Sequence, residues 1–206
     1  MSVEIETLRG AAALDIIDAV SRLRIDVFAA WPYLYSGNAA YERSYLAEFA
    51  SADDAVVVVA RDTALPSADA IVGAATAAPL MSHTSEFAPL FADKGYAPER
   101  VFYFGESVLR ESHRGRGIGH AFFDHREAAA AAARTPSGDP FSLTAFCAVI
   151  RDPDDPRRPA GYRPLDSFWV KRGYMPKPYM IGSYDWEEPD SEGEIPHSMQ
   201  FWVRPL

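Results

Sequence analysis

The chain has 206 residues, of which 48% are hydrophobic and 24% are charged, and this composition suits one soluble domain with a sizeable core. Its formal net charge of −9 argues against nucleic acid as the main partner, because phosphate binding needs a surplus of lysine and arginine. No apolar run approaches the ~20 residues that a membrane span needs. The acidity favours a cationic small-molecule ligand, although net charge also serves solubility alone.

The beginning of the chain and its single cysteine bear on the compartment. The first residues, Met1-Ser2-Val3-Glu4-Ile5-Glu6, are acidic and alternate in polarity, which predicts a strand and not a signal peptide. Cys147 has no disulfide partner in the chain and lies in an apolar run, so we expect a buried thiol. A reducing, cytoplasmic location is expected, with no membrane partner.

The first half of the chain predicts a strand, two helices and a hairpin. A short strand is expected over residues 3–8, and apolar residues then recur at helical spacing from 14 to 30, where Pro32 ends the helix. Asn38 is placed to cap a second helix that runs to about residue 50. Residues 56–60 form a continuous apolar run that predicts a buried strand, with residues 70–78 as its hairpin partner.

The second half alternates strands and helices. Residues 79–100 are irregular, which predicts a lid or an inserted helix. Further elements are expected in this order: a strand at 101–109, a helix at 117–134, a strand at 141–150, a short helix at 164–172, and strands near 179–186 and 197–203. The order predicts an α/β fold with a mixed sheet of about seven strands, helices on both faces, and a single domain over residues 1–206.

A glycine-rich loop lies between the strand at 101–109 and the helix that follows it. It reads His113-Arg114-Gly115-Arg116-Gly117-Ile118-Gly119-His120. The first N–H groups of a helix lack internal partners and carry the positive end of its dipole. Glycines let the backbone approach a phosphate closely, and the two arginines add full charges. The loop therefore predicts a phosphate site, and a pyrophosphate suits its length best.

Three phosphate-binding patterns compete for this loop. A P-loop needs Gly-Lys-Ser/Thr at its end, which is absent, and a dinucleotide fingerprint fails at His120 or Phe122, where its last glycine or alanine belongs. Arg114, Gly117 and Gly119 match the third pattern, Arg/Gln-x-x-Gly-x-Gly/Ala, in full. In this loop the chain resembles the GNAT superfamily of N-acetyltransferases. The resemblance implies that the loop binds the pyrophosphate of acetyl-CoA, the acyl donor.

A second segment extends the resemblance. Phe168-Trp169-Val170-Lys171-Arg172-Gly173-Tyr174 is similar to the family's aromatic-aromatic-x-Lys-x-Gly-aromatic signature, which places Phe168 and Lys171 beside the CoA arm. The family's strand before the loop opens away from its neighbour, so that its backbone binds pantetheine and polarises the thioester. The resemblance implies the following cofactor-binding residues: Val108, Leu109, Arg110, Arg114, Gly115, Arg116, Gly117, Ile118, Gly119, His120, Phe168 and Lys171.

Acyl transfer to an amine needs a base, and Glu106 is the candidate. A period of two puts it on the same strand face as Phe102, Phe104 and Val108, where loss of solvation raises the pKa of a carboxylate. Gly105 marks a possible bulge next to it, and the family often places its base at this point of the strand. The alternative is an edge carboxylate that pairs with an arginine.

The acid is where the sequence departs from the family. Many members use a tyrosine at the position that Trp169 occupies, and an indole donates a hydrogen bond but is no usable acid. Tyr174, Tyr103 and Tyr162 are possible substitutes, and a CoA thiolate also leaves well without an acid. Three histidines near the loop lack the i, i+4 spacing of a helical zinc site, so no metal is expected.

The acceptor side is expected opposite the CoA, where the aromatic loop with Trp31, Tyr33 and Tyr35 would line it. Aromatic rings suit a cation or an apolar group, and they equally serve packing. The predicted function is transfer of an acetyl group from acetyl-CoA to a primary amine of a small molecule, by a monomer or homodimer. Alternatives are acetylation of a peptide or protein N-terminus, a non-catalytic acyl-CoA sensor, and a structural module with a vestigial loop.

Overall fold

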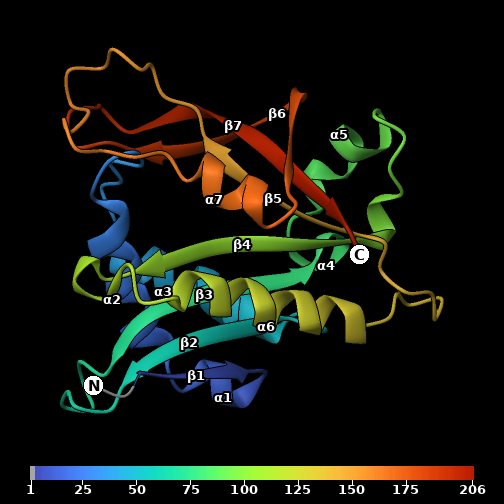
Figure 1. Cartoon of the computed structure of the whole chain (residues 1–206), viewed down its shortest axis with the longest axis horizontal. Helices are drawn as coiled ribbons and strands as arrows, with labels where there is room; N and C mark the ends of the chain where they lie inside the picture. Colours follow the sequence, from blue (N-terminus) through green and yellow to red (C-terminus); the bar gives the residue numbers. More distant parts are fainter. Residues whose placement is uncertain (1–2) are drawn as a thin grey trace.

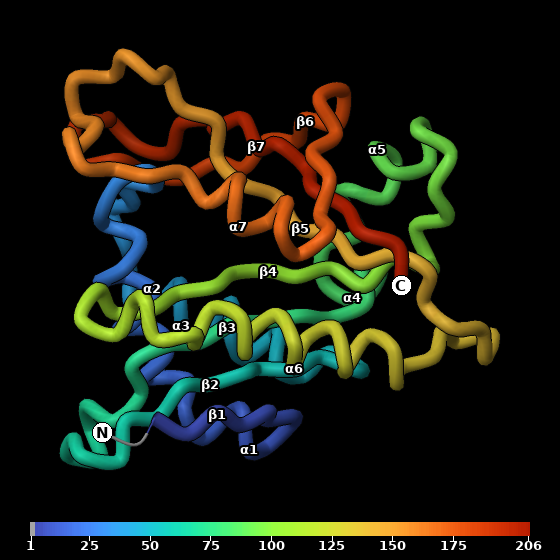
Figure 2. The backbone as a smooth tube through the Cα atoms, in the orientation of Figure 1, coloured from blue at the N-terminus to red at the C-terminus, as the bar shows by residue number. Residues whose placement is uncertain are grey.

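One seven-stranded sheet organises the computed structural model, which describes residues 3–206 and leaves Met1 and Ser2 undescribed. Its strand order is β1-β2-β3-β4-β5-β7-β6, and only β4 and β5 pair in parallel (Figures 1 and 2). The strands are β1 (Val3–Leu8), β2 (Val56–Asp62), β3 (Ile71–Pro79), β4 (Val101–Leu109), β5 (Leu143–Val149), β6 (Met175–Glu187) and β7 (Glu194–Pro205). The predicted mixed sheet is confirmed.

Helices cover both faces of the sheet, as the sequence predicts. Figure 1 shows α6 and α7 on the near face and α2 and α3 behind it. The longer helices are α2 (Ile17–Phe28), α3 (Ala39–Ser51) and α6 (Ile118–Ala132), and the short α-helices are α1 (Ala11–Leu14), α4 (Leu80–His83), α5 (Ala88–Ala92) and α7 (Asp166–Lys171). The short 3₁₀ turns are η1 (Ser85–Phe87), η2 (Pro98–Arg100) and η3 (Glu111–His113).

The sequence determines where α3 begins. The Asn38 side chain accepts hydrogen bonds from the backbone N–H groups of Ala40 and Tyr41, at 2.9 and 3.1 Å, and so satisfies two free donors of the first turn of α3. The predicted cap is confirmed. The loop between α2 and α3 carries Trp31, Tyr33 and Tyr35.

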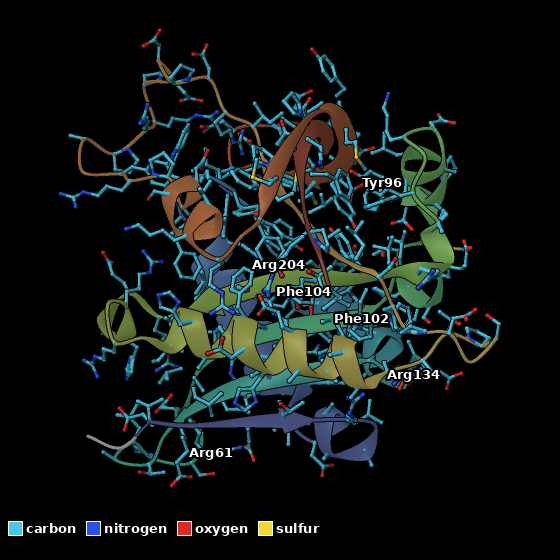
Figure 3. The ribbon with its side chains drawn as sticks, turned by 45° about the vertical axis from the view of Figure 1, so that its right-hand side comes forward. Arg61, Tyr96, Phe102, Phe104, Arg134 and Arg204 are labelled. Carbon is cyan, nitrogen blue, oxygen red and sulfur yellow. The ribbon has the colours of Figure 1, made fainter. Side chains whose placement is uncertain are left out.

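The core is divided between the two faces of the sheet. On the face of α2 and α3, Val57, Val59 and Val108 pack with Leu23 and Leu46. The opposite face carries Phe102 and Phe104 of β4, which Figure 3 labels, and they pack in one cluster with Phe123 of α6. The β3 segment Ile-Val-Gly-Ala-Ala-Thr-Ala-Ala is wholly buried, because its small side chains let helices approach the sheet from both sides.

The segment 79–100 forms several short helical pieces instead of a loose lid. Phe87 and Phe91 from η1 and α5 are buried against Phe201 of β7, with ring centroids 5.1 and 5.3 Å away. Tyr96 lies at this end of the molecule (Figure 3). Of the two predicted alternatives, a lid or an inserted helix, the structure therefore has the helical one. No helix among residues 3–206 combines the length and apolarity that crossing a membrane requires.

Candidate active site

The strands β4 and β5 separate soon after they begin. They pair only at Val101 with Leu143, Phe102 with Thr144 and Tyr103 with Ala145. Beyond Tyr103, β4 continues to Leu109 while β5 continues to Val149 without a ladder between them. The edge of β4 that faces β5 therefore leaves backbone groups at Val108 and Leu109 without a strand partner on that side. Such groups are available to a ligand that lies between the two strands.

A bulge interrupts β4 beside this opening. Ser107 pairs with Ala75 of β3 and Phe104 pairs with Ala77, so that Gly105 and Glu106 together face Thr76. The Glu106 N–H donates to the Thr76 hydroxyl at 3.2 Å. A Cβ at position 105 would lie 2.4 Å from the same hydroxyl, so only glycine fits there. The predicted bulge at Gly105 is confirmed.

The bulge reverses the faces of the residues that follow it. Phe102 and Phe104 pack under α6, whereas Val108 packs with α2 and α3, and the Glu106 side chain meets Arg24 of α2. The prediction that Glu106 shares a face with Phe102 and Phe104 is therefore wrong. A strict period of two holds only while no residue is inserted, and the bulge inserts one.

The α6 side of the bulge is held by Arg126, which sequence reasoning missed. Its Nη1 donates to the carbonyl oxygens of Thr76 and Glu106, at 3.4 and 3.3 Å, and its guanidinium lies 4.5 Å from the Phe104 ring centroid. The residue is 1% exposed, and burial lowers its pKa to about 10. An arginine within a helix face rich in phenylalanine and alanine is the signal that reveals such an internal brace.

Glu106 belongs to a buried group of three charges. Its Oε1 lies 2.6 Å from Nη1 of Arg24, and the Arg24 Nε bonds the carboxylate of Glu42. Glu106 is 8% exposed and Glu42 is fully buried. Burial opposes the charge of Arg24, yet attraction to Glu106, Tyr45 and Glu42 outweighs it and raises the pKa of the guanidinium. Glu106 was expected to lie among aromatic rings. The structure instead pairs it with an arginine, as the alternative interpretation proposed.

Tyr103 and Cys147 meet where the two strands separate. The Tyr103 hydroxyl lies 3.0 Å from the Cys147 sulfur, and Tyr184 of β6 bonds Tyr103 in turn. Burial raises the pKa of Cys147 to about 12, so the thiol stays protonated and is no nucleophile at neutral pH. Burial also raises the pKa of Tyr103 well above its ordinary value. The pair lies on the sheet face that carries Tyr184, opposite to that of Phe146.

Tyr174 lies elsewhere than its predicted role requires. It is fully buried on the α6 face, and its hydroxyl contacts Thr144 at 3.0 Å and Glu127 at 3.3 Å. Burial raises its pKa. The phenol is buried on the sheet face opposite to the Glu106 side chain, and its hydroxyl already contacts Thr144 and Glu127. We therefore withdraw Tyr174 as the acid.

The glycine loop has the backbone that its sequence predicts. Gly115 and Gly117 have φ angles of 74° and 80°, in the left-handed region that glycine favours, and Gly117 is the N-cap of α6. A Cβ on either residue would meet nothing within 4 Å, so the loop surface is open. Arg114 is exposed, and Ile118 anchors the helix start in the core.

The loop is fastened to the sheet from behind. The buried His113 contacts Asp62 at the end of β2 through Nε2, at 3.0 Å, and Ser112 through Nδ1, at 2.9 Å. The hydrogen bond from His113 lowers the pKa of Asp62. Arg116 donates to the Ser112 carbonyl at 2.8 Å. These contacts fix the backbone of the loop while its glycines stay exposed. His113 therefore anchors the loop to β2.

The α7 helix lies against the start of α6. The Phe168 ring packs edge-on against His120 and Phe123, at 4.8 and 5.6 Å, and it lies 3.7 Å from where a Cβ of Gly119 would be. Lys171 is exposed on the same short helix. The structure therefore gathers the glycine loop, His120 and Phe168 at one place, as expected. Trp169 instead packs on Phe146 and Trp202, both 5.0 Å away.

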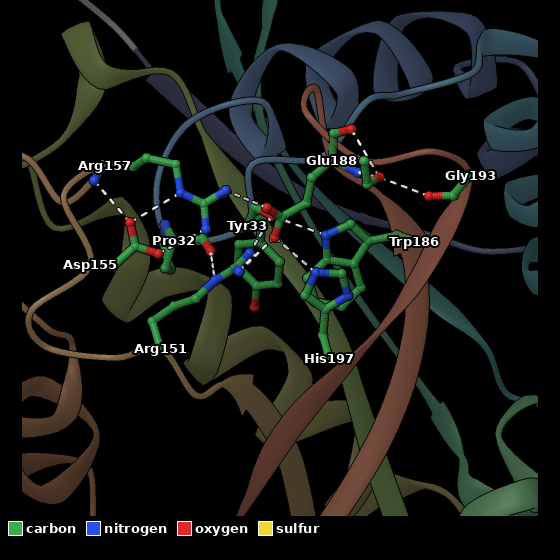
Figure 4. A network of polar contacts seen from close by, with 10 residues as sticks. Pro32, Tyr33, Arg151, Asp155, Arg157, Trp186, Glu188, Gly193 and His197 are labelled. Atoms are coloured by element: carbon green, nitrogen blue, oxygen red, sulfur yellow. Dashed lines mark hydrogen bonds and ion pairs between the residues drawn. The ribbon is translucent and has the colours of Figure 1, made fainter.

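The aromatic loop after α2 is bound by Arg151, which follows β5. Arg151 donates from Nε to the Pro32 carbonyl at 2.6 Å and from Nη2 to the Tyr33 carbonyl at 2.7 Å (Figure 4). The Tyr33 ring lies 4.6 Å from Phe28 of α2. Trp31 packs under the Arg151 guanidinium at 5.8 Å.

The three aromatic residues of that loop have different surroundings. Tyr33 lies nearest to the Glu106 side of the sheet, where burial first, then Cys147, Tyr162 and Glu106 raise its pKa. Tyr35 bonds Glu42 and so belongs to the buried charge group. Trp31 meets Tyr162 edge-on at 6.1 Å. The structure therefore brings Tyr33 to the predicted acceptor side and gives Trp31 and Tyr35 packing and hydrogen-bonding roles.

A pocket of about 550 Å³ lies beside this loop. Its lining includes Arg151, Arg157, Glu188 and His197, with Ile150 and Ile195 at its apolar part. Glu188 is 4% exposed, and burial opposes its charge, yet hydrogen bonds from Arg157, His197 and Arg151 lower its pKa to about 2. No single segment of the sequence predicts this group of side chains, because its members come from two loops and β7.

The described chain has the fold of the GCN5-related N-acetyltransferases, the GNAT fold that the sequence predicts. A member from Kribbella flavida is 16% identical with a TM-score of 0.54, over 99% of this chain and 98% of that one. NAA60 of Arabidopsis thaliana in complex with acetyl-CoA is 14% identical with a TM-score of 0.57, over 100% and 99%. An N-acetyltransferase from Staphylococcus aureus is 10% identical with a TM-score of 0.57, over 100% and 99%.

A scan against protein-family models finds no match, and a search of the curated proteins finds none either. At 10–16% identity the structural likeness establishes the fold and leaves the reaction to the residues of the site.

Proposed function

We propose that the chain is an acyl-CoA-dependent N-acetyltransferase that moves an acetyl group from acetyl-CoA to a primary amine of a small molecule. The observation that carries the proposal is the opening between β4 and β5, which has the glycine loop at its mouth and the Gly105–Glu106 bulge at its side. A donor in this opening would reach from the pyrophosphate site to the one carboxylate of the strand. We infer that residues 1–206 act as one unit.

Acetyl-CoA would lie with its pyrophosphate on the start of α6. Backbone N–H groups at Gly115, Gly117 and Gly119 provide the donors, and Arg114 adds positive charge. Phe168 and Lys171 would flank the CoA arm, alongside His120. The free β4 edge at Val108, Leu109 and Arg110 would bind pantetheine. Ile118 serves the site indirectly by fixing the first turn of α6 in the core, and Arg116 by its bond to the Ser112 carbonyl.

Glu106 would accept the proton of the attacking amine. Its carboxylate lies beside Arg24 on the sheet face of α2 and α3, and a carboxylate within reach of the amine can serve as a general base. The amine nitrogen then attacks the thioester carbonyl, the tetrahedral oxyanion forms next to the β4 backbone, and the carbon–sulfur bond breaks to release CoA thiolate. An ammonium acceptor loses one proton to solvent before the attack, and the second nitrogen proton, lost as the amide forms, ends on Glu106 and passes from there to solvent.

The thiolate would leave with little help. Trp169 is half-buried against Phe146 and Trp202, and its indole provides no proton. Tyr103 lies where the strands separate, and its hydroxyl could donate a hydrogen bond to the CoA sulfur as it contacts the sulfur of Cys147. We therefore assign Tyr103 as a hydrogen-bond donor and not a necessary acid.

The acceptor would be a cationic amine. Glu106 and Glu42 share the single Arg24, so this buried group has a formal charge of −1 that an ammonium matches. The rings of Tyr33 and Tyr45 near it suit a cation. A peptide N-terminus has the same ammonium and is the alternative acceptor. A non-catalytic acyl-CoA sensor is the second candidate, since Trp169 replaces the family's acid and Arg24 occupies Glu106.

Release of free CoA thiol from acetyl-CoA tests the proposal. The protein is assayed with a panel of arylalkylamines, polyamines, amino acids and short peptides, each against a control without protein. An enzyme releases thiol and forms the N-acetyl product with at least one amine. Binding of acetyl-CoA with no product from any acceptor supports the sensor, and no binding at all contradicts both.

A further inference from the structure

Three parts of the chain meet around one buried carboxylate. Arg151 and Arg157 come from the loop after β5, Glu188 follows β6, and His197 lies on β7; together they are called the Glu188 cluster. Arg151 and Arg157 each lie 2.5 Å from one oxygen of Glu188, and His197 Nε2 lies 2.9 Å from Oε1. Figure 4 shows Arg151, Arg157 and His197 around the Glu188 carboxylate. Glu188 thus fixes the direction of the Arg151 guanidinium.

Arg151 uses its three nitrogens on three different partners. Nη1 pairs with Glu188, Nε donates to the Pro32 carbonyl and Nη2 donates to the Tyr33 carbonyl. Its side chain is 12% exposed. A planar guanidinium holds such a geometry better than any other side chain, because its donors are fixed relative to one another. The residue therefore joins the Glu188 cluster to the main chain of the aromatic loop.

Two more bonds reach the same loop from β6. Trp186 Nε1 donates to the Tyr33 carbonyl at 3.0 Å, and the Ser36 N–H donates to the Glu187 carbonyl at 2.7 Å. The Trp186 ring stacks on His197 at 3.5 Å between centroids, so it too depends on the cluster. The loop between α2 and α3 is thus held against the C-terminal hairpin by Arg151, by the Trp186 side chain and by the Glu187 carbonyl.

The position of this loop bears on the proposed base. The Tyr33 ring packs on Phe28, the Phe28 ring lies 5.2 Å from the Arg24 guanidinium, and Arg24 pairs with Glu106. A continuous set of contacts therefore runs from Arg151 through Tyr33 to Glu106. A displaced loop would move Tyr33 away from the acceptor side and leave Phe28 without its ring partner.

We propose that Arg151 is a positioning residue for acceptor specificity: held by Glu188, it fixes the 29–38 loop so that Tyr33 closes the acceptor side and limits the size of the amine. This rests on the proposed function. The acetyl-CoA site is built from other elements, so loss of Arg151 changes acceptor binding and leaves donor binding as it is. Larger amines should gain relative to small ones, because the released loop leaves more room.

The test is the variant Arg151→Ala in the full chain, with Arg158→Ala as the matched control. Arg158 lies in the same loop, donates to the Pro153 carbonyl and packs on Tyr162, but it does not belong to the Glu188 cluster. We expect the acceptor KM of Arg151→Ala to rise about tenfold, with kcat within about twofold and the acetyl-CoA Kd unchanged. Added guanidinium ion should lower the KM again, which general destabilisation would not allow. Arg158→Ala should match the wild type.

Amide hydrogen exchange gives a readout that needs no activity. The Ser36 amide, whose partner is the Glu187 carbonyl, should exchange faster in Arg151→Ala than in the wild type, while amides of β4 keep their rates. Unchanged exchange at Ser36, or an unchanged acceptor KM, overturns the proposal. Faster Ser36 exchange in a variant of a protein that acetylates no amine would support the role of Arg151 in holding the loop. The same result would contradict the proposed function.

Discussion

The two sides of the candidate site are built in opposite ways. The donor side is a run of consecutive residues, His113 to His120, that presents backbone N–H groups from exposed glycines at a helix start. The acceptor side is assembled from α2, α3, β4, β6 and two loops, and its functional groups are buried side chains that hold one another through ion pairs. Recognition by backbone is local in sequence, whereas recognition by buried charge depends on the whole fold.

The largest expected effect separates chemistry from donor binding. Glu106→Gln keeps the shape of the side chain and removes the proton acceptor, so kcat/KM for the amine should fall by about 100-fold or more. The Kd for acetyl-CoA should stay the same, because the loop is untouched. Steady-state kinetics and calorimetric titration measure the two quantities. An unchanged rate would remove Glu106 as the base.

Glu127→Gln is the matched control for that variant. Glu127 also pairs with arginines, Arg172 and Arg204, at 2.7 and 2.6 Å, but it does so on the α6 face with Tyr174. Its loss should lower stability and leave kcat unchanged. An equal loss of kcat in both variants would show that Glu106 acts only through stability.

The Glu188 cluster should make the acceptor side acid-sensitive. The folded-state pKa of Glu188 is about 2, below its ordinary value of 4.5, so its contribution to stability is complete above about pH 5 and is lost as the pH falls toward 2. Glu188→Gln should therefore be less stable than the wild type at pH 7, by on the order of 3 kcal/mol. Denaturant melts between pH 7 and pH 2 should show the difference shrinking, and a constant difference would contradict the assignment.

A smaller effect is expected on the donor side. Gly117→Ala places a side chain at a residue with φ of 80°, which costs about 1–2 kcal/mol of stability. The added methyl also lies on the surface proposed for pyrophosphate, so the acetyl-CoA Kd should rise about tenfold, or ~1.4 kcal/mol. Calorimetric titration measures the affinity, and the thermal midpoint reports the stability.

Gly138→Ala controls for backbone strain in the Gly117 experiment. Gly138 has φ of 87° and equally open surroundings, but it lies in the turn after α6, at the other end of that helix. The two variants should lose similar stability while only Gly117→Ala loses affinity. If both bind acetyl-CoA like the wild type, the loop is not the donor site.

The sequence predicted the fold and the backbone of the glycine loop, and it placed the strands and the longer helices to within a few residues. The pattern at Arg114, Gly117 and Gly119 depends on backbone geometry that nearby residues determine, and the structure has that geometry. The strand at Val101–Leu109 was also placed correctly. The predicted strand face of Glu106 was wrong, because a bulge changes the side on which every later residue lies. Thr76 accommodates that bulge and is 30 residues away in sequence.

The acceptor side was predictable only in part. Tyr33 was expected there, but its anchor Arg151 lies 118 residues later and Glu188 is more distant still. The partners Arg24 and Arg126 of Glu106 come from α2 and α6, and neither has a motif. Tyr174 was chosen from a signature whose last aromatic packs in the core. Single-sequence patterns do not reveal such long-range pairs.

Calorimetric titration of the wild-type chain with acetyl-CoA tests the central claim, that the glycine loop and the β4–β5 opening form an acyl-CoA site. We predict saturable binding of one acetyl-CoA per chain, an affinity that falls about tenfold in Gly117→Ala, and unchanged affinity in Glu106→Gln and Gly138→Ala. No detectable binding at millimolar acetyl-CoA, or binding that Gly117→Ala leaves intact, would contradict the claim.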